Sequence, residues 1–217
     1  MSRRVLGLVM AFGAGVLISA VAYELVADAV ETADRGWSVA AGLFAGCAVF
    51  YVGDTWIDRL GGEGRKDAGG KQADGNALAI VLGIVLDGIP ESIVIGLGLL
   101  SGSAPSAAVV VAVFLSNLPE AAAASAGLSR SGWRQRRLYA LWALVVLISG
   151  LASLAGYAFF GDASGDVLAF MSAFAGGAIL TMLADTMMPE AFEQGGRLVG
   201  VFTTLGFALA FAISALE

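Results

Sequence analysis

Residues 77–100 read ALAIVLGIVLDGIPESIVIGLGLL, an apolar stretch with polar residues at its centre. A second apolar stretch, 106–128, has the same character, with Pro119 and Glu120 near its middle. A transmembrane helix needs about 20 predominantly apolar residues, so both stretches are long enough to span a bilayer. An ionisable side chain in hydrocarbon costs free energy and therefore marks a candidate functional site. We expect two membrane-spanning helices that share one polar site.

The composition of the whole chain agrees with a membrane protein. Hydrophobic residues make up 58% of the 217 residues and charged residues 14%, and the mean hydropathy is +0.84. A soluble domain of this size is less apolar. Apolar stretches of spanning length recur at 5–27, 37–57, 77–100, 106–128, 138–160, 166–189 and 198–216. We predict an all-α polytopic membrane protein with seven transmembrane helices, one transmembrane domain over 1–217, and a short cytoplasmic loop at 61–75.

The positive charges indicate the orientation of this domain. If the N-terminus is cytoplasmic, eleven of the 12 Lys and Arg residues lie on the cytoplasmic side and only Arg35 lies opposite. Cytoplasmic loops of membrane proteins carry such an excess of Lys and Arg. Seven spans then place the C-terminus outside. We therefore predict a multi-pass protein of the cell inner membrane, whose partner is the lipid bilayer and not nucleic acid, because the basic residues lie in loops.

An internal repeat relates the first and sixth spans. Residues 11–31 read AFGAGVLISAVAYELVADAVE, and residues 173–193 read AFAGGAILTMLADTMMPEAFE. The ungapped alignment pairs identical alanine, phenylalanine, glycine and glutamate residues. By the loop assignment the two spans cross the membrane in opposite directions. Inverted repeats around a midplane site are typical of secondary transporters, so we expect that architecture here.

The polar residues of the two central spans are spaced for a shared site. Asp87 and Glu91 are four residues apart and lie on one face of a helix, and Ser116 and Glu120 have the same spacing. Three carboxylates near the middle of a membrane cannot all be charged without a cation among them. We predict a divalent metal site whose ligands are Asp87, Glu91, Ser116, Asn117 and Glu120.

A proline follows each polar segment. Pro90 and Pro119 remove a backbone donor and crowd the carbonyl four residues earlier. We expect two broken helices, whose freed carbonyl oxygens face a cavity. The alternative is that each proline is a simple kink and that a glutamate beside it is protonated. Two antiparallel segments with the same order of residues favour the metal site.

Further acidic residues lie toward the ends of the first and sixth spans. Glu24 and Asp28 are near the external end of the first, and Glu190 is near the cytoplasmic end of the sixth. Acidic residues at the entrance or exit of a pathway raise the local concentration of cations. These residues are therefore candidates for a metal pathway. The alternative is that they are ordinary solvated helix ends.

These segments resemble the Zrt/Irt-like (ZIP) divalent metal transporters, and in particular the bacterial GufA-like branch. That family carries H-N-x-P-E-G in one helix and a polar-polar-x-P-E or -H pattern in the next. The resemblance covers essentially the whole chain. Family members normally have eight spans, and residue 1 corresponds to the start of their second helix. The resemblance implies transport activity, and it suggests a homodimer.

The resemblance also implies roles for single positions. The first-site histidine and glutamate of the family correspond to Asp87 and Glu91, and the ligands of the next helix correspond to Ser116 and Glu120.

The family's second metal site is less complete in this chain. Gly88 stands where the family has an asparagine ligand, and Asn117 occupies the neighbouring second-site position on the other helix. An additional acidic ligand of the family aligns with Thr186, beside Asp185. One well-formed site is therefore expected, with Asp185 as a further candidate ligand and Thr186 on the pathway.

The types of ligand atom limit which metal ions the predicted site can bind. The chain contains no histidine, so the site is oxygen-rich. Carboxylate and carbonyl oxygens suit harder ions such as manganese, whereas the family favours zinc. We predict import of zinc into the cytoplasm, with manganese, iron or cadmium as alternatives. Without a P-loop, HExxH or GxSxG motif, neither ATP-driven pumping nor an enzyme is expected. Two other readings stay open: a degenerate metal-binding protein that does not transport, and metal export.

Overall fold

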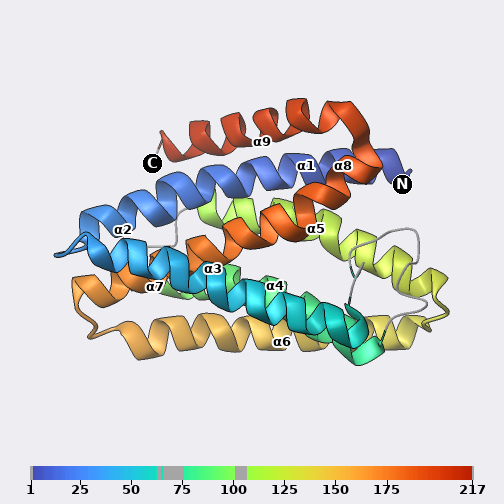
Figure 1. Ribbon diagram of the computed structural model, residues 1–217, viewed down its shortest axis with the longest axis horizontal. Helices are drawn as coiled ribbons and strands as arrows, with labels where there is room; N and C mark the ends of the chain where they lie inside the picture. The colour runs from blue at the N-terminus through green and yellow to red at the C-terminus, as the bar shows by residue number, and fades with distance from the viewer. Residues whose placement is uncertain (1, 63–64, 66–75, 101–106, 217) are drawn as a thin grey trace.

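The protein is a bundle of long helices that lie roughly along one common axis (Figure 1). This computed structural model describes residues 2–62, 65, 76–100 and 107–216. Within these ranges all regular structure is helical. The predicted all-α polytopic fold is confirmed, because most of these helices are long and apolar enough to cross a membrane.

The described ranges contain a succession of helices. In chain order they are α1 (Arg3–Ala20), α2 (Ala27–Thr32), α3 (Trp37–Ile57), α4 (Ala77–Gly98), α5 (Ala107–Arg130), α6 (Gln135–Phe160), α7 (Gly165–Met182), α8 (Met188–Gly195) and α9 (Val199–Ser214). Single π-helical stretches, Val21–Val26 and Leu183–Met187, join α1 to α2 and α7 to α8. A further such turn, Asp58–Gly62, extends α3.

Six continuous helical stretches of the described chain have the length and hydropathy of a membrane span. The last stretch, Gly165–Ser214, is 50 residues long and contains a reversal at Gly196. Gly196 has a positive φ of 65°, a conformation that glycine adopts without a steric penalty. The helix pair α7–α8 and the helix α9 therefore run in opposite directions (Figure 1). The described part of the chain thus crosses the bundle seven times, in agreement with the predicted spans.

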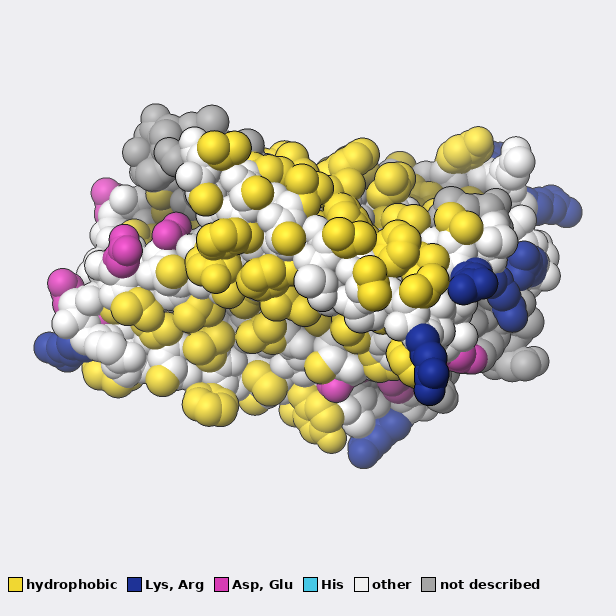
Figure 2. Space-filling view, turned by 90° about the horizontal axis from the view of Figure 1, so that it is seen from above, with side chains coloured by type: hydrophobic (Ala, Val, Ile, Leu, Met, Phe, Trp, Pro, Cys, Tyr) yellow, Lys and Arg dark blue, Asp and Glu magenta, His cyan; other side chains and the backbone are white. Residues whose placement is uncertain are grey.

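The surface has the character of a protein embedded in lipid. Large apolar side chains face outward along the bundle, with Phe44 77% exposed and Phe159 80% exposed. Figure 2 shows hydrophobic side chains as a broad central band on one face of the molecule. Most Lys and Arg side chains gather at one end of the molecule, and acidic side chains predominate at the other (Figure 2). The end with the basic residues is the one where the N-terminus lies.

The internal repeat is present as a repeated helix contact. α1 packs against α9, and α7 packs against α3. A Cβ atom added at Gly15 of α1 would overlap the carbonyl oxygen of Thr203 in α9. At the matched Gly177 of α7, a Cβ would overlap the carbonyl oxygen of Leu43 in α3. Small residues allow the backbones of membrane helices to approach closely, so these glycines set both contacts.

Glycines of α9 and α3 also contact the backbones of α1 and α7 at matched positions of the repeat. Gly206 of α9 packs on the carbonyl oxygen of Phe12, and Gly46 of α3 packs on that of Phe174, which is the repeat partner of Phe12. The π-helical stretches start at Val21 and Leu183, which are matched positions of the repeat. The symmetry therefore includes α3 and α9 as well, although their sequences show little similarity.

Substitution of Gly177 by alanine should destabilise this scaffold. The added methyl group has no space beside the carbonyl of Leu43, and overpacking of this kind costs about 1–3 kcal/mol. We expect the Gly177→Ala variant to unfold in detergent at a lower temperature than the wild type. Tryptophan fluorescence measures this unfolding. Gly200→Ala is the matched control, because a Cβ at Gly200 in α9 meets no atom within 4 Å. Equal unfolding temperatures of the two variants would contradict the close contact.

Candidate metal site

Two antiparallel helices, α4 and α5, carry the predicted polar segments. α4 begins after Asn76, whose side-chain oxygen accepts a hydrogen bond of 2.9 Å from the backbone N–H of Leu78. Pro90 lies inside α4 and Pro119 inside α5, yet both helices continue through them. The expectation of two broken helices was therefore wrong.

Side-chain hydroxyl and amide groups bond to the backbone around both prolines. The Ser92 hydroxyl donates to the carbonyl of Gly88 at 2.6 Å. The Asn117 amide donates to the carbonyl of Val113 at 2.9 Å, and the Ser116 hydroxyl lies 3.0 Å from the same oxygen. Their acceptors are Gly88 and Val113 and not the carbonyls of Leu86 and Leu115, four residues before the prolines, so these bonds do not replace the backbone bonds that the prolines remove.

Glu91 is the centre of the polar contacts between α4 and α5. Its side chain is buried, with the residue only 3% exposed. The Ser116 hydroxyl donates to Oε1 of Glu91 at 3.2 Å, and the Asn117 amide donates to Oε2. The structure thus brings together three of the predicted ligands. Each helix alone is apolar enough to face lipid, but the hydrogen bonds satisfy the polar groups only when the two helices meet.

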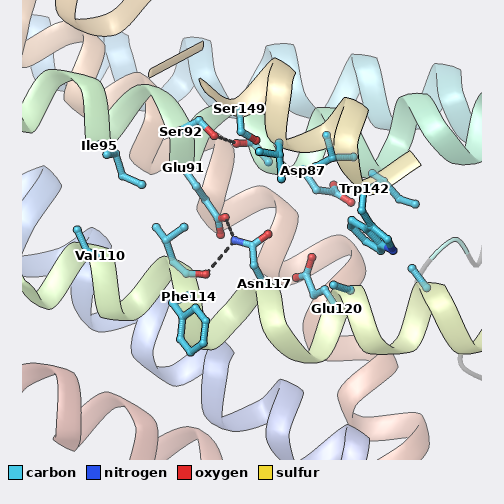
Figure 3. A pocket seen from close by; sticks show the side chains of 17 residues that line it. Asp87, Glu91, Ser92, Ile95, Val110, Phe114, Asn117, Glu120, Trp142 and Ser149 are labelled. Carbon is cyan, nitrogen blue, oxygen red and sulfur yellow. Dashed lines mark hydrogen bonds between the residues drawn. The ribbon is translucent and has the colours of Figure 1, made fainter. Parts of the chain in front are cut away.

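A cavity of about 450 Å³ lies beside this contact, bounded by α4, α5 and α6. Asp87 and Glu91 from α4 and Asn117 and Glu120 from α5 line it, and Figure 3 shows the two sets pointing toward one another. Ser116 is fully buried behind the wall. The arrangement presents three carboxylates and an amide to one cavity, and these oxygen donors are chemically suited to a cation.

The rest of the cavity wall is mostly apolar. Residues from α6 close one side, with Trp142 and Ser149 among them. The indole N–H of Trp142 donates to the hydroxyl of Ser125 in α5 at 2.9 Å, so this bond ties α6 to α5. The sequence reasoning missed α6 as a wall, because its apolar residues resemble those of any lipid-facing helix. The available signal was the presence of Trp142 and Ser149 within the apolar stretch 138–160.

Asp87 lines the cavity, but its carboxylate is bound by an arginine. Nε and Nη2 of Arg65 each lie 3.0 Å from an oxygen of Asp87, and Arg65 also contacts Asp54 and Asp58. Arg65 belongs to the predicted 61–75 loop, which was expected on the cytoplasmic side. Its side chain is only 3% exposed. Residues 63–64 and 66–75 of that loop lie outside the described residues.

The sequence reasoning also missed Asp54. This residue is buried in α3, four positions before Asp58, so the two carboxylates lie on one helix face. An acidic residue within an apolar span was the signal that could have identified it.

The remaining predicted residues lie away from the cavity. Asp185 is exposed on the π-helical stretch of the sixth span, and the Thr186 hydroxyl donates to the carbonyl of Met182 at 2.8 Å. Glu24 and Asp28 lie at the acidic end of the first span, and Glu190 lies in α8. None of them contributes to the described cavity wall. Sequence spacing cannot show this, because it does not fix which face of a helix meets which neighbour.

In the described ranges no three His, Cys, Asp or Glu side chains are arranged to hold a metal ion. The carboxylates of Asp87, Glu91 and Glu120 line one cavity without converging on a single point. Asp87 is turned to Arg65, and Glu91 is held by Asn117 and Ser116. A cation bound by all three would therefore require these side chains to rearrange.

Comparison with known proteins gives one informative similarity. No family model matches the chain. A protein of Arabidopsis thaliana, described as a putative zinc transporter, is 26% identical over 215 residues. The chain is similar to this putative zinc transporter. The aligned region is 97% of this chain, so it includes both polar helices, the repeat and Arg65.

The similarity has a defined extent. The chain spans about a third of the length of this relative, which is covered to 34%. The similarity is consistent with the resemblance to the ZIP family and with the predicted role in metal transport. Membership of the bacterial GufA-like branch stays a prediction.

Proposed function

We propose that the protein moves divalent metal cations across a membrane, with Glu91 at the centre of the binding site. The observation that carries this proposal is the buried carboxylate of Glu91 between two transmembrane helices, on the wall of a cavity that also presents Asp87 and Glu120. Carboxylates at this depth are costly unless a cation or a hydrogen-bond network compensates them. The similarity to a putative zinc transporter supports the same function.

The proposed cargo is zinc, with manganese, ferrous iron and cadmium as competitors. The candidate donors are carboxylate, amide and hydroxyl oxygens, and the chain has no histidine. An oxygen-only site favours harder ions, whereas the similarity favours zinc. Asp87, Glu91, Asn117 and Glu120 are the proposed ligands, and Ser116 orients Glu91. A transporter also has to release its cargo, and a site without imidazole or thiolate is suited to weak binding of zinc.

The proposed direction is import into the cytoplasm of a cell with an inner membrane. The end of the bundle with most of the Lys and Arg side chains is assigned to the cytoplasm. A negative membrane potential then favours cation entrance by about 2.3 kcal/mol per charge per 100 mV. The similarity to a transporter also points away from an enzyme.

Uptake by the purified protein in liposomes tests this function. Zinc, manganese, ferrous iron and cadmium are supplied outside, and uptake is compared with that of the Glu91→Ala, Glu120→Ala double variant. We expect uptake by the wild type, and a loss of that uptake in the double variant, because both carboxylates face the cavity. The ratio of the initial rates ranks the four metals. Equal uptake by both proteins would contradict the proposed site.

A metal-binding protein without transport is the second candidate. The contact between Arg65 and Asp87 favours it, because one of three predicted carboxylate ligands is already bound by a cation of the protein. Calorimetric metal binding without uptake by correctly folded protein would identify this function. Metal sensitivity of cells after gene deletion, in place of metal starvation, would indicate export.

A further inference from the structure

The Arg65 guanidinium is buried among three carboxylates. Its Nε and Nη2 atoms lie 3.0 Å from the two oxygens of Asp87, Nη2 also contacts Asp54, and Nη1 lies 3.4 Å from Asp58. Burial by itself would lower the pKa of Arg65, but the charges of Asp87 and Asp54 and their hydrogen bonds raise it above its ordinary value. The side chain is therefore a permanent cation inside the protein.

The fold provides space for this side chain. Gly83 lies one turn before Asp87 on α4, and a Cβ atom at Gly83 would overlap Cδ of Arg65. Its Nε would be only 2.7 Å from the same Cβ. The side chain of Arg65 therefore passes over α4 at Gly83, where no side chain blocks it. A surface arginine that meets an acid by chance would not need such a gap, so the contact is a built feature of the structure.

Asp87 belongs both to this cluster and to the cavity. Its two carboxylate oxygens each accept a hydrogen bond from Arg65, and the residue also lines the cavity that holds Glu91 and Glu120. A bidentate guanidinium contact uses the same oxygens that a metal ion would bind. The guanidinium and a divalent cation are therefore alternative partners of one carboxylate.

We propose that Arg65 is a tethered cation that competes with the transported metal for Asp87. This inference rests on the proposed function. Metal binding that includes Asp87 requires Arg65 to leave, so the apparent affinity equals the intrinsic affinity multiplied by the fraction of protein in which Arg65 is displaced. Because the arginine is part of the chain, its local concentration is high and independent of the ions outside. Return of the guanidinium to Asp87 then helps to release the metal at the end of the protein where the basic residues gather.

Metal titration of variants in lipid nanodiscs tests this competition. Isothermal titration calorimetry with Zn²⁺ and Mn²⁺ is carried out on the full chain and on Arg65→Gln. We expect the variant to bind metal at least about tenfold more tightly, because the competitor is removed and Asp87 is retained. In the Arg65→Gln, Asp87→Asn double variant, this gain should disappear. A purely structural role of Arg65 would not produce a gain in affinity that depends on Asp87.

Two further variants test whether the gain in metal affinity comes from displacing Arg65 from Asp87 and not from the loss of a positive charge alone. Gly83→Ala keeps the arginine but fills its space, so it should raise metal affinity in the same direction as Arg65→Gln. It also decides the question if Arg65→Gln does not fold. Arg59→Gln is the matched control, because Arg59 is an exposed arginine in the turn Asp58–Gly62 that extends α3. Its affinity should equal that of the wild type.

The outcomes distinguish the two proposals. If the wild type takes up metal and Glu91 is required, but neither Arg65→Gln nor Gly83→Ala binds metal more tightly, the competition is overturned and the transport function stands. If uptake by the wild type does not depend on Glu91, the proposed site fails and the competition for Asp87 at that site fails with it, and if the wild type takes up no metal, the transport function fails. Tighter binding by the Arg65 variant that persists without Asp87 also overturns the competition.

Discussion

Replacement of Glu91 by glutamine is expected to reduce metal uptake by more than about 100-fold while the protein stays folded. The side chain is buried, and its carboxylate lies between the Ser116 hydroxyl and the Asn117 amide on the cavity wall. Glutamine has the same shape but no charge, and it binds metal poorly. Loss of outer partners of metal ligands already costs about 10–100-fold, so loss of a ligand should cost more.

The measurement is the initial rate of metal uptake in liposomes, together with the affinity from calorimetry. Asp162→Asn is the control, because Asp162 is an exposed acid in the connection between α6 and α7. This variant should behave like the wild type. Glu120→Gln should also lower uptake, since Glu120 lines the same cavity. Wild-type rates in Glu91→Gln would show that the metal passes without this carboxylate.

Replacement of Asn117 by aspartate is expected to make the stability of the protein depend on metal. The Asn117 amide donates to Glu91, so aspartate would place two carboxylates in contact inside the membrane. Without metal, their repulsion and desolvation should destabilise the fold. With metal, the pair becomes a stronger cation site. Binding to the folded state alone stabilises it by about 2.7 kcal/mol when the free metal is at 100 times its dissociation constant.

Thermal unfolding with and without metal or a chelator measures this effect. The unfolding temperature of Asn117→Asp should fall below that of the wild type in chelator and should rise more steeply with added Zn²⁺ or Mn²⁺. Asn117→Ala is the matched control, because it removes the contact to Glu91 without adding a charge. If metal shifts the aspartate and alanine variants equally, the two side chains do not form a cation site.

Much of the central contact could be predicted from the sequence. Glu91, Ser116 and Asn117 belong to two apolar stretches with the same local order of residues, and the structure brings these three side chains together. The prediction was possible because a polar residue in a membrane span has few alternatives to a polar neighbour. Their role as metal ligands stays a prediction.

Other parts could not be predicted from spacing. Pro90 suggested a broken helix, whereas α4 continues through it from Ala77 to Gly98. Asp185 was predicted as a further ligand because it lies beside Thr186, which aligns with an acidic ligand of the family, but Asp185 is exposed on the stretch Leu183–Met187. In both cases the result depends on how the helices pack against one another, and local sequence does not specify this.

The sequence by itself determined the number of spans, the asymmetry of the positive charges and the relation between the first and sixth spans. These properties follow from hydropathy and from residue identity along the chain, which act locally. Only the tertiary structure decided that α3 and α9 belong to the same symmetry, that α6 closes the cavity, and that Arg65 binds Asp87. Gly83 and Asp54 have meaning for Arg65 only after α3 and α4 have packed, because burial and close approach exist only between helices that have already met.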